Sequence, residues 1–153
     1  MLLVAAPSVR AQAPAEPAGR FSGSIRGASV GGALDNARFS GSVDISPSAK
    51  GTPGVWKVEI KLSAMGQSSM GSMTNMLQWS MSPGRCGSRT QFLVPPTELP
   101  PLELRSGGNA DATWEGSISL APSGSYQLMV YDKGLREQDI VACANLRFSA
   151  PKK

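Results

Sequence analysis

The chain has 153 residues, a length that suits one domain with one core. Its formal net charge is +4, and the basic residues are scattered instead of clustered, which argues against a nucleic-acid-binding surface. The chain contains no histidine. This excludes histidine-dependent acid–base catalysis, the serine and cysteine triads that need histidine, and the commonest catalytic zinc and copper ligand sets.

Residues 1–19 are rich in alanine and proline and combine two features of an export signal. Residues 2–6 are a short apolar run, and residues 11–13, Ala-Gln-Ala, match the small-residue pattern of a signal-peptidase site. We interpret the segment as the remnant of a signal peptide whose charged start is missing because the start codon is assigned too far downstream. The alternative is a disordered tail. The interpretation predicts an exported protein, periplasmic or extracellular, and no other segment is apolar enough to span a membrane.

The two cysteines, Cys86 and Cys143, are consistent with one disulfide in an exported protein. The alternative is a pair of buried free thiols in a cytoplasmic protein. The export pattern favours the disulfide, which would close a loop of nearly sixty residues.

The rest of the chain shows short strand patterns separated by turns, with no helical periodicity. We expect strands at residues 21–26, 39–45, 55–64, 77–82, 111–120, 126–130 and 140–148. Residues 89–94 are compatible with a strand or an extended loop. Residues 94–104 contain four prolines, which limit that segment to a loop with at most an edge strand. About eight short antiparallel strands predict an all-β sandwich or flattened barrel over residues 20–150, with 151–153 as a tail.

Two patterns predict details of that fold. The repeated sequences RFSGSI at 20–25 and RFSGSV at 38–43 indicate a hairpin of two similar strands. The alternation of residues 55–62 places Trp56 and its period-two neighbours in the core. Trp79 and Trp114 also fall on inward positions, and we interpret all three tryptophans as core anchors.

Four segments resemble the copper–zinc superoxide dismutase family, and especially its secreted bacterial members. The sequence WSMSPGRC at 79–86 is similar to the family pattern W-H-x-H-x-G-x-C, and DIVACANL is similar to the segment with the second disulfide cysteine. VWKVEIKL and SGSYQLMVYDK resemble two further strands of that family. The resemblance runs from about residue 55 to 146 and implies an eight-stranded Greek-key fold with a disulfide between Cys86 and Cys143.

The metal-ligand positions depart from the family pattern. Ser80 and Ser82 stand where the family has two copper-binding histidines, and Tyr131 stands where it has a third. The substrate-guiding arginine is replaced by Ile140. Serine hydroxyls and a phenol are poor copper ligands at neutral pH. The resemblance therefore implies the scaffold without superoxide chemistry, and we expect a non-enzymatic exported domain with a structural or protein-partner-binding role and no bound metal cofactor.

A methionine-rich segment supports an alternative function. Met65, Met70, Met73 and Met76 lie in a stretch rich in glycine and serine, where their thioethers could converge on Cu(I), a soft ion. The competing interpretation is adaptable packing or a contact surface. Met81, between the two serines, is expected in the core. The alternative hypothesis is thus a periplasmic Cu(I)-binding protein.

The acidic residues give no further site. They are scattered along the sequence, and we interpret them as solvated surface: Glu98, Glu103, Asp111 and Glu115. Arg85 and Arg89 flank Cys86 and are expected on the surface as well.

Overall fold

The computed structural model describes residues 19–27, 38–65, 76–88, 91–132 and 134–152. The strands in these residues are β1 (Arg20–Gly27), β2 (Arg38–Pro47), β3 (Val55–Met65), β4 (Met76–Pro83), β5 (Leu102–Glu103), β6 (Asn109–Ser117), β7 (Tyr126–Asp132) and β8 (Ile140–Ser149). Two short 3-10 helices, η2 (Pro96–Glu98) and η3 (Glu137–Asp139), lie between them. No helix in the described ranges has the length and hydrophobicity needed to cross a membrane.

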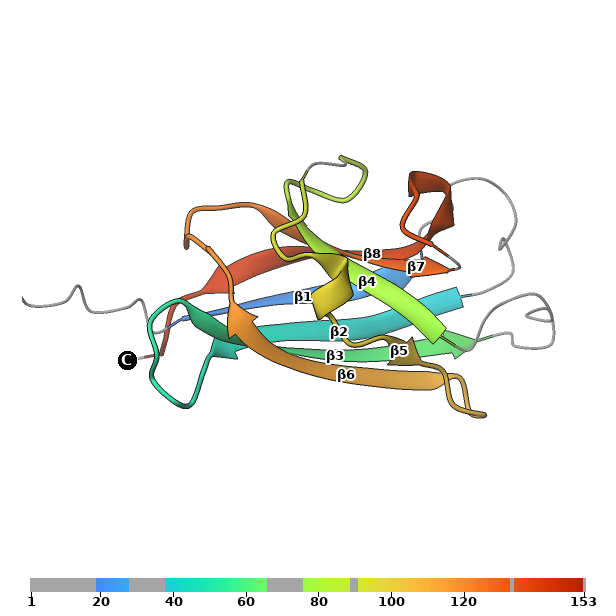
Figure 1. Ribbon diagram of the computed structural model, residues 1–153, viewed down its shortest axis with the longest axis horizontal. Helices are drawn as coiled ribbons and strands as arrows, with labels where there is room; N and C mark the ends of the chain where they lie inside the picture. The colour runs from blue at the N-terminus through green and yellow to red at the C-terminus, as the bar shows by residue number, and fades with distance from the viewer. Residues whose placement is uncertain (1–18, 28–37, 66–75, 89–90, 133, 153) are drawn as a thin grey trace, which may run out of the picture.

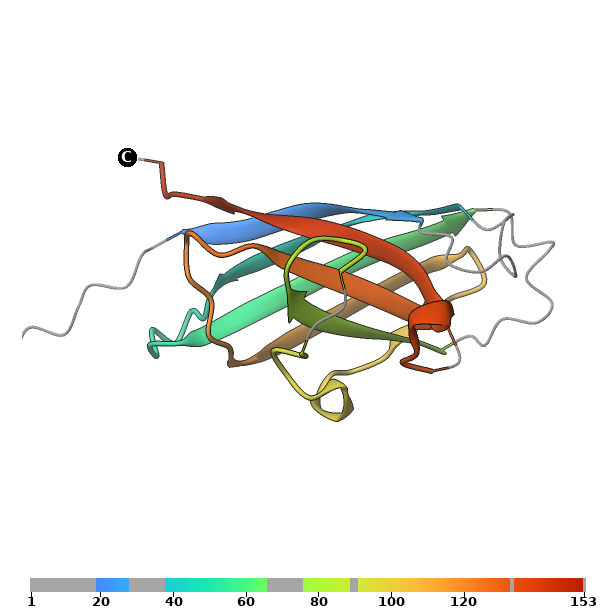
Figure 2. The same cartoon turned by 90° about the horizontal axis from the view of Figure 1, so that it is seen from above.

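The described strands form one eight-stranded antiparallel sheet in the order β5-β4-β7-β8-β1-β2-β3-β6. The sheet curls until β5 comes into contact with β6, which makes it a nearly closed barrel (Figures 1 and 2). The chain crosses between distant strands after β3 and again after β6. Such long connections are typical of Greek-key folds, and the predicted all-β antiparallel architecture is confirmed.

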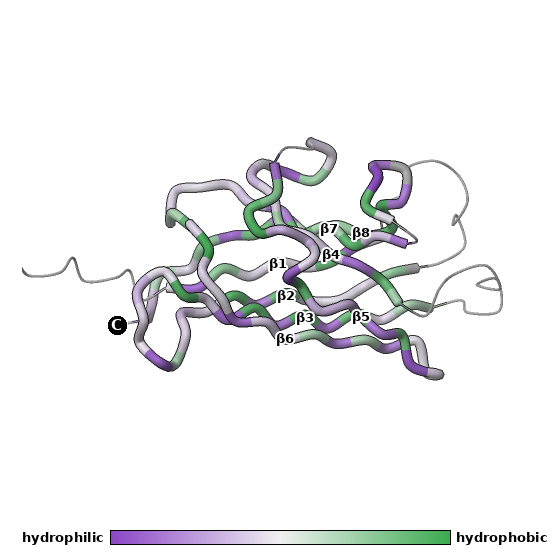
Figure 3. The backbone as a smooth tube through the Cα atoms, viewed as in Figure 1, coloured by the Kyte–Doolittle hydropathy of each residue, from purple (hydrophilic) through white to green (hydrophobic). Residues whose placement is uncertain are grey.

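Period-two alternation places the core inside the barrel. In β3 the residues Trp56, Val58, Ile60 and Leu62 are buried, and the lysines and glutamate between them face outward. Figure 3 shows this alternation of apolar and polar residues along β3 and β6. Burial of these apolar side chains is the main stabilising contribution to such a fold.

One end of the barrel is filled by aromatic rings. Phe21 lies edge-on to three of them, with ring centroids 5.8 Å from Trp56, 5.5 Å from Tyr126 and 5.2 Å from Phe148. These four residues belong to β1, β3, β7 and β8, so the cluster ties strands from both ends of the chain together.

The predicted hairpin of similar strands is confirmed, because residues 21–26 of β1 pair with residues 40–45 of β2 in an antiparallel register. The glycine of each repeat lies where a neighbouring strand passes closely. A Cβ added at Gly41 would lie 2.1 Å from the carbonyl oxygen of Lys61, and one at Gly23 would lie 2.5 Å from that of Asn145. The glycines at equivalent positions of the two repeats therefore allow β2 to pass close to β3 and β1 to pass close to β8.

Two segments that the sequence left open take one of their expected forms, and one strand boundary differs from the prediction. Residues 91–94 belong to a loop instead of a strand, and Leu93 N–H donates a 2.8 Å hydrogen bond to the Met81 carbonyl. The eighth strand is the two-residue edge strand β5, which lies in the proline-rich segment 94–104 where the sequence allowed an edge strand. This segment is tied to the core by the indole N–H of Trp79, which donates to the Pro100 carbonyl at 2.6 Å. The predicted strand at 111–120 runs from Asn109 to Ser117, but Ile118 still packs in the core.

Candidate functional site

The three positions that correspond to copper ligands in the resemblance lie together on one face of the β4–β7 ladder. Leu77, Trp79 and Met81 of β4 face the core, so Ser80 and Ser82 face outward. In β7 the same alternation turns Gln127, Met129 and Tyr131 outward. Ser80 is in register with Met129, and Ser82 with Gln127. The structure therefore brings the predicted positions side by side.

This outward face is nevertheless buried. Ser80, Ser82, Gln127 and Tyr131 are each 0% exposed. Figure 1 shows two segments rising beyond the layer of β4, β7 and β8: residues 84–88, here called the disulfide loop, and residues 134–139, which lead into β8. Leu135 of the second segment and Ile140, the first residue of β8, pack against a small cluster of Met129, Tyr131 and Cys143.

The buried polar groups form a short hydrogen-bonded chain. The Ser80 hydroxyl donates to the Tyr131 hydroxyl at 3.0 Å, and Tyr131 donates in turn to the Met129 sulfur at 3.5 Å. A buried hydroxyl with such a partner avoids most of its desolvation cost. The three side chains have the contacts of a structural polar cluster.

Ser82 differs from Ser80 because its hydroxyl has no hydrogen-bond partner among the described residues. A buried hydroxyl in that state costs about 1–3 kcal/mol of stability. Ser82 is therefore the member of the cluster that contributes least to stability.

Gln127 joins the strands to the disulfide loop, a role that the sequence analysis missed. Its side-chain amide donates to the carbonyls of Pro83 and Ser88. Its carbonyl oxygen lies 3.8 Å from the Cys143 sulfur. The signal that would have found it is the period-two pattern of β7, which places Gln127 on the same face as Met129 and Tyr131.

The predicted disulfide between Cys86 and Cys143 is present and links the disulfide loop to β8. The two cysteines are separated by 57 residues. Next to the bridge, the Cys86 N–H donates to the side-chain oxygen of Asn145 at 2.8 Å. The loop is thus held to β8 by one covalent and one polar contact.

The methionine-rich segment is only partly described. Met70 and Met73 lie outside the described residues. Met65 and Met76, the two methionines that bound the segment, are 64% and 47% exposed. Met81 is in the core, as predicted.

The acidic candidates do not converge. Asp111 pairs with Arg105 at 2.9 Å on the surface, and Glu115 accepts a 2.8 Å hydrogen bond from Ser48. The described residues hold no group of three or more histidine, cysteine, aspartate or glutamate side chains placed for a metal ion. Elsewhere, the hydrogen bond and charge of Asp139 raise the pKa of Arg136 above its ordinary value. Arg85 is exposed, as predicted, and Arg89 lies outside the described residues.

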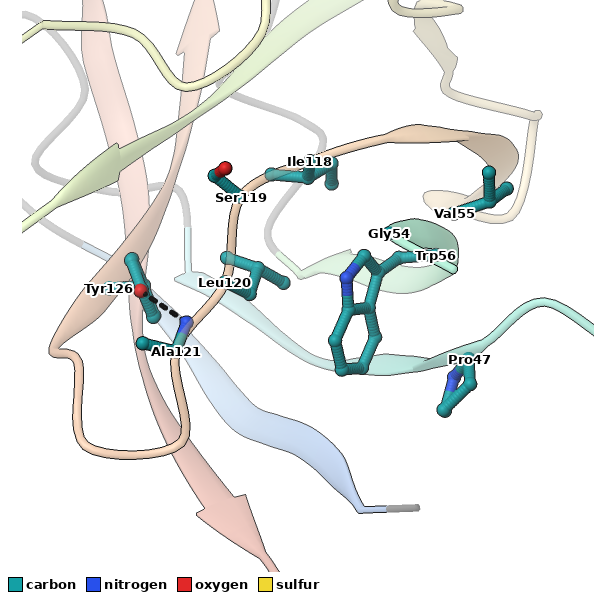
Figure 4. Close-up of a pocket in the computed structure, with 9 residues that line it drawn as sticks. All are labelled: Pro47, Gly54, Val55, Trp56, Ile118, Ser119, Leu120, Ala121 and Tyr126. Atoms are coloured by element: carbon teal, nitrogen blue, oxygen red, sulfur yellow. Dashed lines mark hydrogen bonds between the residues drawn. The ribbon is translucent and has the colours of Figure 1, made fainter. Parts of the chain in front are cut away.

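A notch of about 500 Å³ lies at the aromatic end of the barrel (Figure 4). Trp56, Ile118, Leu120 and Tyr126 line it, together with backbone and small side chains. The Tyr126 hydroxyl accepts a 2.7 Å hydrogen bond from the N–H of Ala121, which fixes the rim. None of the described residues that line this notch has a charged side chain.

Comparisons of the chain with protein-family models, curated proteins and solved structures give no match. The family resemblance therefore stays a hypothesis that rests on the residues themselves.

Proposed function

We propose that this chain is a non-enzymatic exported domain of dismutase-like architecture, which serves as a stable scaffold for a partner. The observation that carries the proposal is the buried cluster on β4 and β7. Ser80 and Tyr131 form a hydrogen bond at positions where the superoxide dismutase family that the sequence resembles has copper ligands. Neither side chain is a good ligand for copper at neutral pH.

The disulfide supports the exported location in this proposal. Bridges such as Cys86–Cys143 persist in oxidising compartments and are rare in the cytosol. The bridge also suits a scaffold role, because a cross-link stabilises the fold whether or not the protein has a catalytic site.

The proposal is tested by a superoxide dismutation assay. The oxidised protein is incubated with Cu(II) and Zn(II), dialysed to remove free metal, and compared with a Ser80→Ala/Ser82→Ala variant treated in the same way. We expect both proteins to give the same background rate. A wild-type rate clearly above that of the variant would contradict the proposal.

A Cu(I)-binding role is the second candidate, and the exposure of Met65 and Met76 favours it. Thioethers that face solvent are accessible to a soft ion, whereas those in the core are not. The hypothesis predicts that replacing Met65, Met70, Met73 and Met76 with leucine abolishes Cu(I) binding in a competition titration but leaves the fold intact. Equal affinity in the leucine variant would show that these methionines are not a copper site.

A further inference from the structure

A polar groove of about 860 Å³ lies on the outer face of β8, β1 and β2. Its lining includes Ser22, Ser24, Arg26, Ser42, Asn145 and Arg147, and the disulfide lies beside it. The serines and arginines are on the outward positions of their strands, opposite the core residues Phe21 and Ile25. The groove is therefore part of the open surface of the sheet and separate from the buried β4–β7 cluster.

The charge of this surface is uneven. The sequences of β1 and β8 contain Arg20, Arg26 and Arg147 but no acidic residue. Asp44 of β2 is the acidic residue in the groove lining. No ion pair in the described part of the chain includes Arg26 or Arg147. Their guanidinium groups are available for an external anion.

The other half of the same sheet is different. On β3, Lys57 pairs with Glu59 at 2.9 Å, and Lys61 stands opposite Asp111 of β6. Cations there have acidic neighbours within the protein. The excess positive charge of the outer surface thus falls on the β1–β8 half.

The groove also presents oriented hydrogen-bonding groups. The side-chain oxygen of Asn145 is engaged by Cys86 N–H, which leaves the amide N–H groups of Asn145 as donors. The serine hydroxyls both donate and accept. Guanidinium groups bind carboxylates with two parallel hydrogen bonds. Together these groups suit a ligand with several hydroxyls and carboxylates.

Three other ligand classes fit less well. The three strands are paired on both sides, so a peptide cannot add to them as a strand. The described residues that line the groove include no aromatic side chain, which argues against base stacking by single-stranded nucleic acid. The exposed large apolar residues, Met65 and Met76, are not in the lining, which argues against membrane insertion.

The spacing of the two arginines along the sheet also fits an extended ligand. Arg26 stands opposite Cys143 in the β1–β8 ladder, and Arg147 lies four residues further along β8. This offset corresponds to about 13 Å along the strands. An oligomer of sugars is long enough to span this offset and to contact both arginines at once.

We propose that this groove binds an acidic polysaccharide, with uronate carboxylates at Arg26 and Arg147 and sugar hydroxyls at the serines and Asn145. This inference rests on the proposed partner-binding function and names the chemical class of the partner.

The test is a calorimetric titration of the oxidised full-length protein at low ionic strength with oligogalacturonate. The fully methyl-esterified oligomer, which has the same sugars without the charge, is the ligand control. The Arg26→Gln/Arg147→Gln variant is compared with Lys57→Gln/Lys61→Gln, which removes the same charge from β3. We expect the acid oligomer to bind, the ester to fail, and the arginine variant to lose roughly tenfold or more in affinity, with the lysine variant within about twofold.

Three results would overturn the inference: no binding of the acid oligomer, equal binding of the ester, or equal losses in the two variants. Binding of duplex DNA with the same arginine dependence and equal affinity would also overturn the assignment to a polysaccharide. The dismutation assay on the same sample separates the two proposals. Failure of the titration without dismutase activity rejects the polysaccharide alone, whereas dismutase activity rejects the non-enzymatic role.

Discussion

The outer face of β4 and β7 and the outer face of β1, β2 and β8 belong to the same sheet but differ in what covers them. On the first, the disulfide loop and residues 134–139 bury polar side chains, so each hydroxyl or amide needs a partner inside the protein. On the second, polar side chains face the solvent, and their partners are water or a ligand. The comparison shows that outward positions on a strand become part of the core wherever a loop closes over them.

The largest expected effect comes from removing the Cys86–Cys143 disulfide, which holds the disulfide loop to β8. The Cys86→Ala/Cys143→Ala variant should lose about 4 kcal/mol in the free energy of unfolding, because the unfolded chain is no longer constrained over a long loop. Urea denaturation of the oxidised wild type and the variant measures this difference. A loss below about 1 kcal/mol would mean that the bridge adds little to the other contacts of the loop.

The second effect concerns the hydrogen bonds that Gln127 donates beneath the disulfide loop. Gln127→Leu keeps a side chain of similar size but removes the donor to the carbonyls of Pro83 and Ser88. We expect a loss of about 1–3 kcal/mol in the free energy of unfolding, since these buried groups lose their partner. Ser24→Ala on the open face is the matched control and should change stability by no more than about 0.5 kcal/mol. Equal losses in the two variants would contradict the distinction between the faces.

The smallest effect separates the two serines of the covered face. Ser80→Ala removes a hydrogen bond to Tyr131 and should cost about 1 kcal/mol. Ser82→Ala removes a hydroxyl that has no partner among the described residues, and it should be neutral or stabilising. Thermal unfolding of the two variants decides this. A larger loss for Ser82→Ala than for Ser80→Ala would show that Ser82 has a stabilising partner.

The sequence predicted the strands well because their alternation is a local property. The residues of β3 show this clearly, since each inward position was assigned from neighbours two residues away. The edge strand β5 lies in the segment 94–104, where the sequence allowed an edge strand but did not fix its position. It has two residues and forms through pairing with β4, a partner distant in sequence.

The candidate site was predicted in part. Ser80, Ser82 and Tyr131 were placed together through the resemblance, and their alternation agrees with that placement. The burial of this face was not predictable, because it depends on where the disulfide loop folds back. The same is true of the groove. Its serines and arginines come from β1, β2 and β8, and the pairing of β1 with both other strands brings them together.

The central claim is that the β4–β7 face is a closed polar cluster without a metal. The most direct test of this claim is urea unfolding in the presence and absence of Cu(II). A ligand bound only to the folded state at a concentration 100 times its Kd would stabilise the protein by about 2.7 kcal/mol. We predict a shift below about 0.5 kcal/mol for the oxidised protein. A stabilisation by Cu(II) that the Ser80→Ala/Ser82→Ala variant lacks would contradict the account and identify this face as a copper site.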